Sequence, residues 1–197
     1  TLDTGPIPSY DHVGNILYNM VVNPVTGKLY VSNIQSPNEV QYEGPGHLSG
    51  TTVQGRLSES RITVIDIDSG KVESKHLNQH IDYNLRHTNI PDDFDTSVKA
   101  HSLATPLEMV VSADGKTIYT AAYGSSKIGV FDAAAIEAGD FKTSFKPRSA
   151  SARYIDTGPG PSGLALDEAR KRLYVYTRFD NAVSVINLES KETEQTI

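Results

Sequence analysis

One pattern of residues occurs three times along the chain, and this repetition limits the fold more than any other feature. Each copy has a short apolar stretch, a polar turn, a stretch centred on a tyrosine, and a stretch in which Val or Ile alternates with polar residues. The central tyrosines are Tyr30, Tyr119 and Tyr174. Such alternation indicates half-buried β-strands, and a fourth, more polar strand follows in each copy. Repeated units of four antiparallel strands predict the blades of a β-propeller.

The repeats divide residues 1–197 into about three four-stranded blades of an all-β protein. Blade 1 spans roughly 14–77 with an insertion at 34–60, a connector insertion covers 78–105, blade 2 spans roughly 106–157, and blade 3 spans roughly 161–197. The phrase "DTGP" stands both at 3–6 and at 156–159, where it precedes the first strand of a blade. We therefore expect the first residues to be a strand of a preceding blade. Closed propellers have about four to eight blades, so we expect an incomplete portion of a larger ring, completed by the remainder of its own chain or by other subunits.

Propeller connectivity assigns the loops to two opposite faces. Connectors between blades, and loops that join the second strand of a blade to the third, share a face that we call the upper face. The insertions 34–60 and 78–105 are both expected there, and long loops of this kind are commonly functional. A third insertion, 133–151, contains the helix-like stretch "AAAIEAGD" and is expected on the lower face in a structural role.

The upper-face connectors carry most of the histidines, and histidine is a common metal ligand. The candidate metal ligands are His12, His47, His80 and His101. Solvated or hydrogen-bonding histidines are the commoner situation in polar loops, and the chain has no HExxH or comparable spacing. Both interpretations stay open on the sequence.

The same loops carry aromatic and arginine side chains that suit an interaction surface. The candidates are Tyr42, Tyr83, Tyr123 and Arg178. Tyrosine and arginine are enriched at protein interfaces, where they supply large contact areas and charged hydrogen bonds.

Composition excludes several classes of function. The 18 Lys and Arg against 24 Asp and Glu give a formal net charge of −6 without a basic stripe, so nucleic acid is not expected as a partner. The apolar runs are too short to span a membrane. The chain has no cysteine, which rules out disulfides, thiol catalysis and CxxCH haem attachment within these residues. The nucleophile motif GxSxG is absent. We expect that this segment is not catalytic by itself and holds no cofactor of its own.

Two stretches resemble a known repeat family. "GKLYVSN…RITVIDIDSGKV" and "KRLYVYTRFDNAVSVINLES" are similar to the YVTN-type β-propeller repeats of bacterial exported proteins. More narrowly, "ESRITVI", "SLATPLEMVVSADG" and "GPSGLALDEARKRLYVYTRFDNAVSVI" resemble large bacterial propeller proteins fused to a cytochrome c peroxidase-like module with c-type haem. The resemblance implies a periplasmic or extracellular location. Because no CxxCH is present, it implies that any haem lies outside residues 1–197.

Three functions are therefore compared. The first is a non-catalytic scaffold or interaction part of a larger exported bacterial protein that is associated with c-type cytochrome electron transfer. The alternative is a surface propeller that binds a protein or a glycan and has no redox role. The third is a propeller hydrolase of the lactonase kind, for which the sequence contains no motif.

Overall fold

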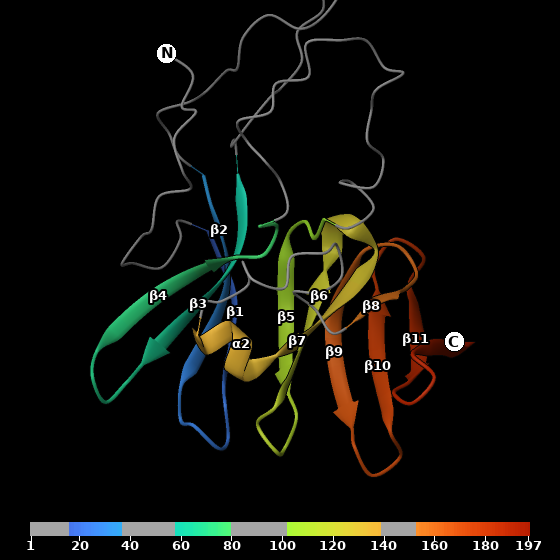
Figure 1. Cartoon of the computed structure of the whole chain (residues 1–197). Coiled ribbons are helices and arrows are strands. Elements are labelled where there is room, and N and C mark those ends of the chain that lie inside the picture. Colours follow the sequence, from blue (N-terminus) through green and yellow to red (C-terminus); the bar gives the residue numbers. More distant parts are fainter. Residues whose placement is uncertain (1–15, 37–57, 80–101, 139–152) are drawn as a thin grey trace, which may run out of the picture.

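A computed structural model of the chain describes residues 16–36, 58–79, 102–138 and 153–197. These residues form three four-stranded antiparallel sheets, each built from strands that are consecutive in the sequence (Figure 1). The strands are β1 (Ile16–Val22), β2 (Leu29–Gln35), β3 (Glu59–Asp66) and β4 (Lys71–His76) in the first sheet, β5 (Pro106–Val111), β6 (Thr117–Ala122), β7 (Lys127–Asp132) and β8 (Arg153–Asp156) in the second, and β9 (Pro161–Asp167), β10 (Arg172–Thr177), β11 (Ala182–Asn187) and β12 (Glu192–Thr196) in the third. The 3-10 turn η3 (Tyr123–Ser125) joins β6 to β7, and the helix α2 (Ala133–Ala138) follows β7.

The three sheets lie side by side as blades, with β1, β5 and β9 as neighbouring inner strands (Figure 1). The alternation in the sequence places one row of side chains of each sheet against the next sheet. One apolar core between blades 1 and 2 includes Tyr30, Ile62 and Phe131, and a second core between blades 2 and 3 includes Tyr119 and Leu173. The prediction of an all-β propeller segment with three four-stranded blades is confirmed.

In blades 1 and 2 the repeated tyrosine packs its blade against the blade that follows. Tyr30 is fully buried in the first core and Tyr119 is buried in the second. The ammonium of Lys191, on blade 3, lies 5.8 Å from the centre of the Tyr119 ring, a cation–π contact across the two blades. The sequence repeat is thus also a repeat of contacts between blades.

Helix α2 joins the first two blades at the lower face, where its carboxylate Glu137 contacts blade 1. Thr26 and Tyr30 donate hydrogen bonds to Glu137 at 3.0 and 2.5 Å, and the Lys28 ammonium lies 2.8 Å from it. Burial alone would raise the pKa of the Glu137 carboxyl, but the hydrogen bonds from Lys28, Tyr30 and Thr26 outweigh it, so that the pKa is lowered. The helix that we expected in the third insertion is present, and it ties blade 2 to blade 1.

The first insertion is shorter than expected. The ladder between β2 and β3 continues to the pairs Ile34–Ser60 and Gln35–Glu59, so these four residues belong to strands and not to the insertion at 34–60. The reason is that backbone pairing extends beyond the alternating apolar residues that define the pattern in the sequence. In the described parts of the chain, no helix has the length and apolar character needed to cross a membrane.

Candidate functional site

The inner strands carry a repeated hydrogen bond between blades. The Asn19 side chain on β1 accepts a hydrogen bond from the backbone N–H of Met109 on β5 at 3.2 Å. One blade further on, Glu108 on β5 accepts a hydrogen bond from the backbone N–H of Leu164 on β9 at 3.1 Å. An N–H on the inner edge of a blade has no neighbouring strand to pair with, and an unpaired buried donor is costly. The two side chains satisfy these donors and fix the spacing of the inner strands.

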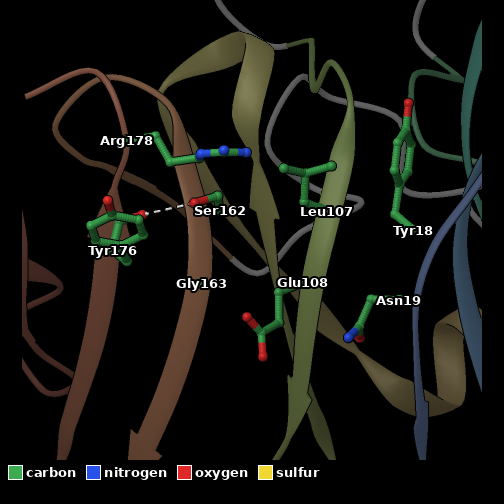
Figure 2. A pocket seen from close by; sticks show the side chains of 8 residues that line it. All are labelled: Tyr18, Asn19, Leu107, Glu108, Ser162, Gly163, Tyr176 and Arg178. Carbon is green, nitrogen blue, oxygen red and sulfur yellow. Dashed lines mark hydrogen bonds between the residues drawn. The ribbon is translucent and has the colours of Figure 1, made fainter. Parts of the chain in front are cut away.

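A pocket of about 480 Å³ opens beside these two hydrogen bonds, along the inner strands of all three blades (Figure 2). Its lining residues are Tyr18, Asn19, Leu107, Glu108, Ser162, Gly163, Tyr176 and Arg178. The pocket is an open hollow rather than an enclosed cavity, and a few convergent polar groups on such a wall can orient a bound molecule. The pocket combines two aromatic rings, one carboxylate, one guanidinium and short polar side chains, which suits the binding of a polar molecule.

Gly163 makes room for this pocket. In the aligned repeats it takes the position that Asn19 and Glu108 occupy on the other two inner strands. A Cβ at Gly163 would lie 3.3 Å from the Cβ of Tyr176 and 3.5 Å from Oε2 of Glu108. Because the third blade has no side chain here, the hollow in front of Glu108 stays open.

Two opposite charges border the pocket at different places. In Figure 2 the Arg178 guanidinium lies above Ser162, whereas the Glu108 carboxylate lies lower, between β5 and β9. They form no ion pair with each other. Partial burial raises the pKa of the Tyr18 phenol, so this group stays a neutral hydrogen-bond donor at physiological pH.

A second group of residues forms the upper rim beside the pocket: Tyr123, Gly160 and Phe179. The Tyr123 and Phe179 rings have their centres 5.1 Å apart and are inclined by 52°. Phe179 is 65% exposed. These residues come from three different connectors, and Gly160 fits beneath the rings because it has no side chain. An exposed aromatic ring that packs on a half-buried one, as Phe179 does on Tyr123, suits an interaction surface.

Backbone hydrogen bonds hold the rim connectors in place. The N–H groups of Arg178 and Phe179 donate to the carbonyls of Gly160 and Pro159 at 3.0 and 3.3 Å, and the N–H of Tyr123 donates to Thr105 at 3.0 Å. The rim therefore has a defined shape although it consists of loops.

Two of the predicted interaction residues meet at this place. Tyr123 is part of the rim, and Arg178 is the sequence neighbour of Phe179 and lines the pocket. The other predicted residues, Tyr42 and Tyr83 for interaction and His12, His47, His80 and His101 for metal, lie outside the described residues. Within the described ranges, no three His, Asp or Glu side chains gather in a way that could hold a metal ion.

The reasoning from sequence missed Phe179 and all the pocket residues except Arg178. An exposed phenylalanine within the polar run "TRFDN" is one signal that could have found the rim. Asn19, Glu108 and Gly163 occupy the same position in the three repeats. The residue type there changes from an amide to a carboxylate to a glycine, and this variation is a signal in the sequence that could have identified the pocket wall.

No protein-family model matches the chain, and no curated protein matches it. Among solved structures, the chain is similar to hydrazine synthase of Kuenenia stuttgartiensis, with a TM-score of 0.62 and 20% identity over 89% of this chain and 46% of that one. It is also similar to U3-55K, with a TM-score of 0.53 and 16% identity over 96% and 42% of the two chains. A chain of a nidogen/laminin complex gives a TM-score of 0.52 and 14% identity over 95% and 49%.

This chain thus spans somewhat less than half the length of each of these solved chains. At such low sequence identities the likeness concerns the fold alone. It agrees with the three consecutive four-stranded sheets. The fold of the described residues is a segment of a β-propeller.

Proposed function

We propose that this propeller segment is a non-catalytic scaffold within a larger exported bacterial protein, and that its upper rim binds a c-type haem module that takes part in electron transfer. The observation that carries the proposal is the exposed ring of Phe179, which packs against the half-buried ring of Tyr123 and is held by connectors of fixed shape. A loop that is ordered before binding loses little conformational entropy when a partner docks. Exposed aromatic side chains in such a setting are favoured as the anchors of interfaces.

The contacts between blades support a scaffold role. Side chains of Asn19, Glu108 and Glu137 each bind the neighbouring blade, so the rim rests on three sheets that are linked at the inner wall and at the lower face. Such a body supplies a rigid platform for a second module.

The sequence resemblance to exported propeller proteins that carry a haem module is the reason for proposing such a module as the partner. The chain has no cysteine, so a covalently attached haem belongs to another part of the polypeptide or to another subunit. The rim would equally suit a protein or glycan partner without a redox role. The experiment must therefore identify the partner as well as detect it.

Photo-crosslinking from the rim tests both parts of the proposal. The photoreactive residue p-benzoylphenylalanine replaces Phe179 in the full-length protein in its native host, and crosslinked peptides are identified by mass spectrometry. The matched control places the same residue at Ile67, which is equally exposed at 65% but lies in the turn between β3 and β4 on the opposite face.

Crosslinks from position 179, and not from position 67, to a segment that bears a CxxCH haem-attachment motif would support the proposal. Crosslinks from position 179 to proteins without such a motif would overturn the redox role and favour the alternative binding propeller. Equal crosslinking from both positions, or none from position 179, would overturn the docking role of the rim.

A further inference from the structure

We propose that the pocket on the inner wall binds a small zwitterionic molecule, with its ammonium group at Glu108 and its carboxylate group at Arg178. This ligand site is separate from the docking of a partner at the rim. It rests on the position of two opposite charges within one pocket and on how each is held.

The two charges do not neutralise each other. Glu108 and Arg178 both line the pocket, but they lie apart and form no ion pair with each other (Figure 2). A ligand that carries both signs of charge can pair with both groups at once, whereas a ligand with a single charge can pair with only one of them. Each charge-assisted hydrogen bond adds to the affinity, so the arrangement favours a zwitterion.

The Glu108 carboxylate is oriented before any ligand arrives. Its Oε2 accepts the hydrogen bond from the backbone N–H of Leu164. The same oxygen lies 3.5 Å from the point that a Cβ at Gly163 would occupy, so the carboxylate borders the space that Gly163 leaves open. The other oxygen, Oε1, accepts no hydrogen bond from the described parts of the chain. An ammonium group beside the carboxylate can donate to it in a charge-assisted hydrogen bond.

Arg178 supplies the opposite charge from a fixed backbone. Its N–H donates to the carbonyl of Gly160 at 3.0 Å, while the side chain itself is exposed toward the pocket. A guanidinium binds a carboxylate through two parallel hydrogen bonds, which gives direction as well as charge. The hydroxyl of Ser162, beside Arg178 in Figure 2, donates a hydrogen bond to the carbonyl of Tyr176 at 3.5 Å.

The remaining lining supplies apolar surface for the carbon chain of such a ligand. Leu107 and the rings of Tyr18 and Tyr176 contribute this surface, and the two rings lie on opposite sides of the pocket in Figure 2. An aromatic ring also attracts a nearby ammonium group. The pocket volume of about 480 Å³ lies within the range of small-molecule sites. A short carbon chain with an amine at one end and a carboxylate at the other fits this description.

A series of ω-amino acids tests the proposal and measures the separation of the two charges. Isothermal titration calorimetry on the full-length protein uses β-alanine, 4-aminobutyrate and 6-aminohexanoate as probes, with butylamine and butyrate as controls that carry one charge each. We expect one chain length to bind best, with a dissociation constant of roughly millimolar or tighter, and each single-charge control to bind at least about tenfold more weakly.

Two variants separate the roles of the charges without removing structure. Glu108→Gln keeps an acceptor for the Leu164 N–H, and Arg178→Gln changes an exposed side chain. We expect each variant to bind the best zwitterion at least about tenfold more weakly. In each variant the zwitterion should then bind no more tightly than one of the two single-charge controls. Arg170→Gln, in the exposed turn between β9 and β10, is the control and should leave binding unchanged.

Three results would overturn the proposal. The first is the absence of binding for every member of the series at millimolar concentration. The second is equal affinity for the zwitterions and for butylamine or butyrate. The third is binding that survives both Glu108→Gln and Arg178→Gln, because the ligand would then occupy another place.

Discussion

Glu108 on β5 accepts the backbone N–H of Leu164 on the next blade at 3.1 Å. Asn19 makes the equivalent contact to Met109 one blade earlier, from the same position of the repeat. Gly163 holds that position in the third blade, where the pocket opens. One position of the repeat therefore serves two purposes. It joins neighbouring blades in the first two copies, and its lack of a side chain in the third leaves space for a ligand.

Replacement of Glu108 tests this contact between blades. Glu108→Ala leaves the Leu164 N–H without its acceptor, so we expect the free energy of unfolding to fall by about 1–2 kcal/mol. Glu108→Gln retains an acceptor of the same length and should lose less than about 0.5 kcal/mol. Urea unfolding measures both. An equal loss in the two variants would show that the charge of Glu108, and not its hydrogen bond, stabilises the fold.

The first two repeat tyrosines are expected to differ in their response to loss of the hydroxyl. The Tyr30 hydroxyl accepts a hydrogen bond from Asn23 at 2.9 Å and donates one to Glu137. Tyr30→Phe removes the hydroxyl and leaves Asn23 and Glu137 without this hydrogen-bond partner, so we expect a loss of about 1–2 kcal/mol in the free energy of unfolding.

Tyr119→Phe is the matched control, because the Tyr119 hydroxyl forms no hydrogen bond with the residues that the structure describes. Its removal should change stability by less than about 0.5 kcal/mol. Thermal unfolding followed by circular dichroism compares the two variants. Equal losses would contradict the assignment of the Tyr30 hydroxyl to the contact with α2.

Much of the fold could be predicted from the sequence, because the repeat and the strand pattern have the same physical origin. Val and Ile at alternate positions pack into a core on one face of a sheet, and this is visible in any one copy. Three copies with Tyr30, Tyr119 and Tyr174 at the same position then indicate blades. The exact ends of the strands were less predictable, since backbone pairing continued to Gln35 and Glu59.

The candidate site was less predictable because it depends on contacts between blades. Phe179 and Tyr123 are distant in the sequence, and only the stacking of two sheets places their rings together. Glu108 belongs to a strand of the core pattern, and nothing in its neighbours along the chain shows that its side chain reaches Leu164. Tyr123 and Arg178 were found because tyrosine and arginine in upper-face connectors are favoured at interfaces.

Stability is expected to fall in acid partly through Glu137. The hydrogen bonds from Lys28, Tyr30 and Thr26 lower the pKa of its carboxyl despite the opposing effect of burial. A folded-state pKa below the unfolded value of about 4.3 contributes stability above that pH, and this contribution is lost as the pH falls through the folded-state pKa.

Glu137→Gln cannot titrate, so its deficit relative to the native chain should be largest at neutral pH and should shrink below about pH 4. Urea unfolding of both proteins at about pH 7 and about pH 3.5 measures the difference. The half-buried carboxylates Asp66 and Glu73 also act on the Lys28 charge. Both are present in the two proteins, so their contributions to the pH dependence largely cancel in the comparison. A deficit that stays constant with pH would contradict the role of the carboxylate charge.

The shape of the rim depends on the missing side chain of Gly160. Gly160 and Gly70 have nearly equal φ angles of +70° and +69°, but a Cβ at Gly160 would lie 2.8 Å from the Phe179 ring, whereas one at Gly70 meets nothing within 4 Å. Both Gly→Ala variants should therefore lose about 1–2 kcal/mol from the left-handed backbone, and Gly160→Ala should lose about 1–3 kcal/mol more from the clash. Removing the Phe179 ring in Gly160→Ala/Phe179→Ala should recover most of this second part, while a contact of 3.2 Å with the Tyr123 ring remains. Urea unfolding against Phe179→Ala alone measures the recovery. If Gly160→Ala proves no more destabilising than Gly70→Ala, the Phe179 ring is not held against the connector.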